Sequence, residues 1–184
     1  MTFIIPTDTC FGIGCRIDDV KSYHKIYKIK KRSYDKPLAI MVEDFDWLEE
    51  NTDLNLEQIE FLKNYKRPFT ILCECPKIKM LLDFEDSNFN YENNKIYEKI
   101  AFRVANTKLQ KNLLKNNGPI FLTSANFSGE KEIYSMEEAK KQFEQYSKNI
   151  EFIGEGTWLN KNIKPSDIFQ FNGSSTDILF LRQN

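Results

Sequence analysis

Short apolar runs alternate with helix-patterned segments along this chain, and that alternation limits its fold more than any other feature. Strands are predicted where apolar residues cluster between turn formers: Phe3–Pro6, Leu38–Val42, Phe69–Cys75, Ile100–Val104, Ile120–Thr123 and Ile178–Leu181, with weaker ones at Glu151–Gly156 and Asp167–Phe171. Helices are predicted where apolar residues recur at helical spacing: Asp19–Lys31, Phe45–Asn51, Leu56–Tyr65, Leu109–Asn116 and Met136–Tyr146, the last with Ser135 as its N-cap. The sequence therefore predicts an α/β fold in which helices flank a twisted mixed sheet.

Length and charge set limits on the function. The 184 residues, 41% of them hydrophobic, can bury one substantial core, so a single domain over residues 1–184 is expected. Lys and Arg number 26 against 27 Asp and Glu, which gives a net charge of -1. Any site for a polyanion must therefore be local, because the chain lacks an overall basic field. Neither a secretory leader nor an apolar run near the roughly 18 residues of a membrane span occurs, so a soluble, cytoplasmic protein is expected.

The cysteines and the histidine do not indicate a metal site. Neither Cys10 with Cys15 nor Cys73 with Cys75 lies on a recognisable zinc knuckle or ribbon, so all four are expected to be small, reduced core residues. His24 is the only histidine, and it lies in a helical pattern where a packing role is expected. No metal ligands are predicted.

Two polar pairs with the same spacing are candidates for binding phosphate. No G-x-x-x-x-G-K-[ST] loop occurs, and Gly12-Ile13-Gly14 lacks a third glycine in register, so side chains would have to bind any nucleotide. Lys30 and Arg32 are two residues apart, and so are Ser124 and Asn126 at the end of a predicted strand. If the chain leaves its helix in an extended conformation, the two cations converge at the edge of the sheet. Taken alone, such residues are commonly solvated cations and turn formers.

The chain resembles a known family through several blocks in one order. They are PTDTCFGIGC (6–15), YKIKKRSYDKPLAIMV (27–42), FTIL (69–72), IAFRV (100–104), LTSANFSG (122–129), KPSDI (164–168) and LR (181–182). This order is similar to that of the short YrdC-like threonylcarbamoyl-AMP synthases. The resemblance implies a YrdC-like fold with a cationic substrate cleft.

The resemblance also implies a reaction and a set of site residues. Such enzymes combine L-threonine, bicarbonate and ATP, with Mg²⁺ arriving on the ATP, into threonylcarbamoyl-AMP and pyrophosphate. Partner proteins then transfer the threonylcarbamoyl group to tRNA, and weak contact with the RNA itself is possible. The signature tetrad of the family, Lys-x-Arg with Ser-x-Asn, falls on Lys30, Arg32, Ser124 and Asn126. Further ligand-binding positions fall on Thr7, Arg103, Thr123, Ser166 and Arg182.

Some positions depart from the family pattern. Lys31 stands where the family commonly has glycine, and Asp167 stands where it commonly has threonine. Family chains usually have a helix before the Pro-Thr-Asp-Thr block, whereas this sequence begins almost at that strand. The polar stretch Asp83–Lys95 is expected to be a solvated loop, with a lid over the site as the other reading.

Other functions stay open at this level. An RNA-binding or ribosome-maturation factor of the same fold would have a concave basic face and a steep salt dependence of RNA affinity. A carbamoyl-transfer role would normally come with further zinc and acylphosphatase modules. Arg103 and Arg182 can also serve structural ion pairs.

Overall fold

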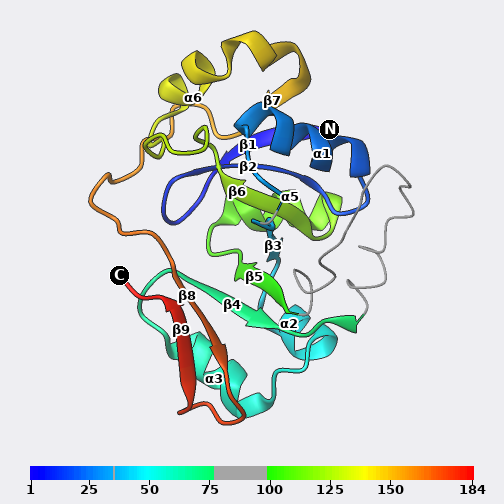
Figure 1. Ribbon diagram of the computed structural model, residues 1–184, viewed down its shortest axis with the longest axis vertical. Helices are drawn as coiled ribbons and strands as arrows, with labels where there is room; N and C mark the ends of the chain where they lie inside the picture. Colours follow the sequence, from blue (N-terminus) through cyan, green and yellow to red (C-terminus); the bar gives the residue numbers. More distant parts are fainter. Residues whose placement is uncertain (35, 77–98) are drawn as a thin grey trace.

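A computed structural model describes residues 1–34, 36–76 and 99–184, and within them nine strands form one mixed sheet (Figure 1). The strands are β1 (Thr2–Pro6), β2 (Phe11–Arg16), β3 (Ala39–Val42), β4 (Phe69–Cys73), β5 (Ile100–Val104), β6 (Ile120–Ser124), β7 (Ile150–Phe152), β8 (Asp167–Phe171) and β9 (Ile178–Arg182). Their order across the sheet is β7-β1-β2-β6-β3-β5-β4-β8-β9. Parallel and antiparallel neighbours both occur, which confirms the predicted mixed sheet.

The strand β2 is absent from the sequence prediction. Its glycines lower the strand propensity of the segment, yet they are what lets β2 lie close to β6. A Cβ atom on Gly14 would be 2.4 Å from the backbone oxygen of Phe121, and one on Gly12 would be 2.8 Å from a methyl group of Leu122. The strand predicted at 151–156 is also wrong in its bounds, because β7 ends at Phe152.

Helices form on both sides of the sheet. They are α1 (Val20–Lys30), α2 (Phe45–Asn51), α3 (Leu56–Asn64), α5 (Lys108–Asn117) and α6 (Met136–Gln142), followed by a 3₁₀ helix at Glu144–Asn149. Ser135 accepts a hydrogen bond from the backbone N–H of Glu138 at 3.1 Å, which confirms the predicted N-cap. The single helix predicted at 136–146 is instead two, since α6 ends before Phe143. The predicted stretch Asp83–Lys95 lies outside the described residues.

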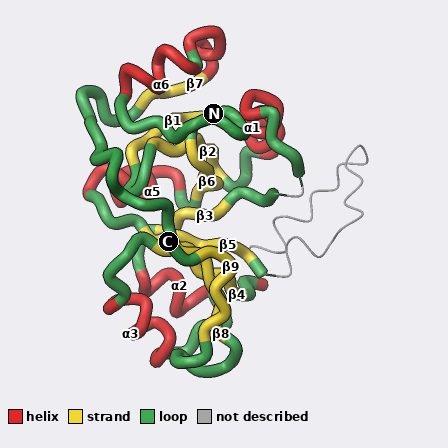
Figure 2. Tube along the Cα trace, turned by 60° about the vertical axis from the view of Figure 1, so that its left-hand side comes forward, coloured by secondary structure: helices red, strands yellow, loops and turns green. Residues whose placement is uncertain are grey.

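Two apolar clusters occupy the two faces of the sheet. On β1, Ile4 belongs to a cluster with residues of α1, α2 and α3, whereas Phe3 and Ile5 belong to a cluster with residues of α5. This alternation is what a strand buried on both faces produces. Figure 2 shows α1 and α5 on opposite sides of β2, β6 and β3.

Gln110 ties α5 to the end of β1. Its side chain completes a capping box with Thr107 at the start of the helix. Its Nε2 also donates to the backbone oxygen of Pro6 at 3.1 Å, and the residue is only 1% exposed. The start of α5 and the end of β1 therefore share one buried side chain.

The cysteines and the histidine lie where packing was expected. Cys10, Cys15, Cys73 and Cys75 are all free and buried. Nδ1 of His24 is 3.4 Å from the hydroxyl of Tyr34, and its ring packs edge-on against Tyr23. Among the described helices, none is long and apolar enough to cross a membrane.

Helix α1 ends in a left-handed residue, so the predicted extended exit is wrong. Lys31 has φ 51° and ψ 40°. Its N–H bonds to Lys28 O at 3.2 Å, and the N–H of Arg32 bonds to Tyr27 O at 3.0 Å. These two bonds form the Schellman arrangement, whose left-handed position usually holds glycine. The chain reverses within one residue, and Lys30 and Arg32 leave it in different directions.

Replacing Lys31 with glycine should stabilise the protein. The left-handed conformation strains a residue with a Cβ atom and costs glycine nothing, so Lys31→Gly should raise the free energy of unfolding by about 0.5–1 kcal/mol. Urea denaturation measures the change. Lys28→Gly is the matched control, because it puts glycine at an exposed position inside the same helix and should lower stability by about 1 kcal/mol. Loss of stability in Lys31→Gly would contradict the assignment of strain.

Candidate active site

A cavity of about 400 Å³ lies among the turn between β1 and β2, the end of β6 and the starts of β3 and β8. Its described lining carries four basic side chains, Arg32, Lys36, Arg103 and Arg182, and one carboxylate, Glu132. Hydroxyl groups also line it, from Thr7, Thr9, Thr70, Thr123, Ser124, Tyr134 and Ser166. Such a set can bind anionic groups through charge and hydrogen bonds together.

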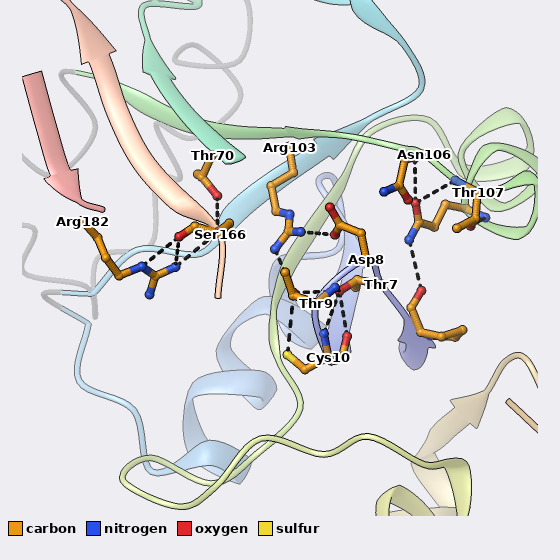
Figure 3. Close-up of polar contacts among 12 residues, drawn as sticks. Thr7, Asp8, Thr9, Cys10, Thr70, Arg103, Asn106, Thr107, Ser166 and Arg182 are labelled. Atoms are coloured by element: carbon orange, nitrogen blue, oxygen red, sulfur yellow. Dashed lines mark hydrogen bonds and ion pairs between the residues drawn. The ribbon is translucent and has the colours of Figure 1, made fainter. Parts of the chain in front are cut away.

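The turn from Thr7 to Cys10 is held by its own side chains. The hydroxyl of Thr7 donates to the backbone oxygen of Cys10 at 2.7 Å and accepts from the N–H groups of Thr9 and Cys10 at 3.2 and 3.3 Å. Arg103 forms an ion pair with Asp8 and approaches the hydroxyl of Thr9 at 3.5 Å (Figure 3). Arg103 therefore fixes the turn to β5.

Arg182 and Ser166 form a second fixed unit on the other wall. Nε and Nη2 of Arg182 donate to the backbone oxygen of Ser166 at 2.9 and 2.7 Å. The hydroxyl of Ser166 also lies 3.0 Å from that of Thr70, as Figure 3 shows. Burial, and then the charge of Arg103, lowers the pKa of Arg182. The two guanidinium groups thus repel each other, and an anion between them would relieve this repulsion.

Arg32 is oriented by backbone carbonyl groups. Its Nε donates to the oxygen of Lys36 at 2.8 Å, and its Nη2 donates to the oxygen of Pro37 at 3.1 Å. Carbonyl groups carry no net charge, so this arrangement fixes the direction of the guanidinium without neutralising it.

Two members of the predicted tetrad line the cavity and two do not. Arg32 and Ser124 are in the lining, as are all five of the further predicted positions, Thr7, Arg103, Thr123, Ser166 and Arg182. Lys30 is 2% exposed, and its Nζ donates to the backbone oxygens of Ser124 and Asn126. The Nδ2 of Asn126 donates to Glu130 O at 2.6 Å, and among the described residues its Oδ1 has no hydrogen-bond partner. Contact of any of these residues with a substrate stays a prediction.

The sequence reasoning missed several lining residues. Glu132 lies in a charged run that is typical of a solvated loop, and Thr9 and Thr70 look like ordinary strand and turn residues. Lys36 could have been found from the sequence, because it precedes Pro37 inside one of the blocks that resemble the family. Cys10 also lines the cavity, and burial raises the pKa of its thiol, so it is protonated at neutral pH.

The buried amine of Lys30 should make stability depend on pH. Burial, together with the charge of Arg32, lowers the pKa of Lys30 to about 7. The unfolded value is about 10.4, so between these pH values the unfolded state binds more protons and stability rises with pH. Between pH 7 and 9 the free energy of unfolding should rise by about 2 kcal/mol more in the wild type than in Lys30→Met.

Urea denaturation at pH 7, 8 and 9 measures this difference. Lys28→Met is the control, because Lys28 is exposed on the same helix, and it should keep the pH dependence of the wild type. Parallel curves for wild type and Lys30→Met would show that the amine keeps its ordinary pKa.

Comparisons with known proteins agree with this fold. The family model Sua5_yciO_yrdC, described as "Telomere recombination", matches residues 1–183. A threonylcarbamoyl-AMP synthase of Vibrio vulnificus (strain YJ016) is 28% identical over 169 residues, which are 89% of this chain and 83% of that protein. E. coli YciO has a TM-score of 0.75 at 22% identity, over 99% of this chain and 82% of that one.

Sua5 of P. abyssi, solved in complex with L-threonine, has a TM-score of 0.71 at 23% identity. The match covers 98% of this chain and 49% of that one, so this chain spans about half the length of that Sua5 protein. The likeness to these structures shows the fold, and the family model covers nearly every residue. The chain belongs to the Sua5/YciO/YrdC family.

Proposed function

We propose that the chain is a threonylcarbamoyl-AMP synthase that acts on L-threonine, bicarbonate and ATP. One observation carries the proposal: seven of the nine site residues expected from the sequence line a single cavity. The name of the Vibrio relative and the threonine in the Sua5 structure support the choice of substrate. The chain's product would pass to proteins that modify tRNA.

The reaction needs no covalent intermediate on the protein. The amine nitrogen of threonine attacks the carbon of bicarbonate, forms an N–C bond, and gives up a proton as water leaves. An oxygen of the resulting carbamate then attacks the α-phosphorus of ATP. As the new O–P bond forms, the bond from that phosphorus to the bridging oxygen breaks and pyrophosphate leaves. The protein's task is to hold two anions together and stabilise charge on the phosphoryl group.

The arginines supply that stabilisation. Arg32 and Arg182 are oriented by carbonyl groups, so their charges are not neutralised by a carboxylate from the described part of the chain. Each can bind a carboxylate or a phosphate through two N–H groups. Lys36 adds a point charge at the mouth of β3. Ser124 and Thr123 can donate hydrogen bonds to a phosphate or to the carbamate.

Mg²⁺ would enter with the nucleotide. Glu132 is the only carboxylate in the described lining, and no group of three or more His, Cys, Asp or Glu residues in the described chain could hold an ion. This donor set fits an ion carried by the phosphates of ATP, which usually keeps several waters and few protein ligands. Mg²⁺ would neutralise part of the phosphate charge when bound.

Glu132 suits the ammonium group of threonine. An amino acid needs a cation for its carboxylate and an anion for its ammonium, and Glu132 is the one anion in a described lining that is otherwise basic or neutral. A carboxylate beside the amine can also accept the proton that the amine loses before it attacks bicarbonate.

An RNA-binding role of the same fold gains no support from the charge balance of 26 basic and 27 acidic residues. The family relationship and the cavity favour small anionic substrates.

Pyrophosphate release tests the proposed function. Purified protein with MgATP, L-threonine and bicarbonate should release pyrophosphate, and omission of either co-substrate should stop it. Arg32→Ala should lower kcat/KM by about 100-fold, since it removes a cation aimed at the developing charge. Arg16→Ala is the matched control, because Arg16 is an exposed arginine paired with Asp18 away from the cavity, and it should leave the rate within about twofold. Folded protein that releases no pyrophosphate in the presence of threonine would overturn the proposal.

Substitution of Glu132 tests its assignment to the amine. Glu132→Gln keeps the shape and removes the charge, so it should raise the KM for threonine by about tenfold and leave the KM for ATP within about twofold. Steady-state kinetics with each substrate varied in turn gives both values. Glu137→Gln, at an exposed position of α6, is the control. An equal rise in both KM values would place Glu132 elsewhere in the mechanism.

A further inference from the structure

Lys30 is almost wholly buried, and a buried lysine requires partners. The residue is 2% exposed, and its Nζ donates to two main-chain oxygens, those of Ser124 and Asn126. Leaving such an amine without partners would cost several kcal/mol, so the two carbonyl groups account for its burial. A charged amine offers three N–H donors and a neutral amine two, so both forms satisfy the two carbonyl groups.

Helix α1 and the segment after β6 each donate hydrogen bonds to the other. We call residues Ser124–Ser128 the β6 exit. The side chain of Lys30 holds the exit at Ser124 and Asn126, and the N–H of Ser128 donates to the backbone oxygen of Lys30 at 3.0 Å. The last residue of α1 therefore holds the exit at three points, with both its side chain and its main chain.

The β6 exit begins inside the cavity wall, whereas Lys30 does not belong to that wall. Thr123 and Ser124 line the cavity, and Arg32 lines it from the other end of the short segment after α1. Because Lys31 is left-handed, the side chain of Lys30 turns toward the exit while that of Arg32 turns toward Lys36 and Pro37. The two cations of the tetrad therefore have different partners.

We propose that Lys30 is a positioning residue, which holds the β6 exit so that Ser124 stays in the cavity wall and which does not itself touch the substrate. Its catalytic consequence rests on the proposed function: a misplacement of about 1 Å in a group that binds the reacting phosphate can cost about 100-fold in rate. Asn126 also acts in positioning: its backbone oxygen accepts a hydrogen bond from Lys30, and its side chain donates to the backbone oxygen of Glu130.

Amide hydrogen exchange without ligands tests the proposal directly. Wild type, Lys30→Met and the control Lys28→Met are compared by NMR, one amide at a time. In Lys30→Met the Ser128 amide should exchange about tenfold faster or more, while amides of β1 and β2 stay within about twofold of the wild type. Lys28→Met should match the wild type throughout. Unchanged exchange along the β6 exit in Lys30→Met would overturn the proposal.

A measurement on the wild type covers the case in which Lys30→Met does not fold. The Cε resonance of Lys30, in protein with ¹³C-labelled lysine, is assigned from its loss in Lys30→Gln, which keeps an N–H donor pair. Saturation with MgATP and threonine should shift it less than the Nε resonance of Arg32. A larger shift for Lys30 would make it a substrate ligand and overturn the positioning role.

Kinetics separates this proposal from the proposed function. In Lys30→Met, kcat for pyrophosphate release should fall about tenfold or more with KM for threonine within about threefold, because the exit loses its register but the amino-acid contacts remain. If the wild type releases no pyrophosphate while Ser128 exchanges faster in Lys30→Met, the synthase proposal fails and the positioning of the exit stands. If activity is lost with exchange unchanged, the positioning proposal fails and the synthase proposal stands.

Discussion

The pairing of β2 with β6 is the contact on which the rest of the structure depends. It joins β7, β1 and β2 to the other six described strands, with Gly14 opposite Leu122 and Gly12 opposite Ser124. A side chain on either glycine would push against β6, so the sheet is continuous because these positions lack a Cβ atom. The cavity takes one wall from each side of this pairing, and it could not exist if the two parts of the sheet separated.

The cavity keeps its positive charge because two of its three arginines are oriented by neutral groups. Arg32 bonds to the carbonyl oxygens of Lys36 and Pro37, and Arg182 bonds to that of Ser166. Among the arginines in the described lining, only Arg103 forms an ion pair with a carboxylate, that of Asp8. An arginine side chain is usually held most firmly by an anion, which also neutralises its charge. Carbonyl partners fix the direction of the guanidinium group and leave its charge available for a ligand.

The sequence predicted the central strands, most helices and seven residues of the cavity lining, and most of its failures have local causes. Phe11–Arg16 was missed because its glycines, which the sheet requires, lower the strand propensity. The convergence of Lys30 with Arg32 assumed an extended chain, whereas Lys31 is left-handed, a conformation rare for lysine. Glu132 carried no pattern of its own, because its place in the cavity depends on contacts between distant segments.

The buried side chain of Gln110 links the opening of a helix to the shape of the cavity. Gln110 caps α5 and also holds the backbone oxygen of Pro6, the residue directly before the Thr7–Cys10 turn. Helix ends fray on fast timescales, and here each fraying event would release the end of β1 as well. Solvent conditions that loosen the first turn of α5 would therefore also loosen the wall of the cavity that carries Thr7 and Thr9.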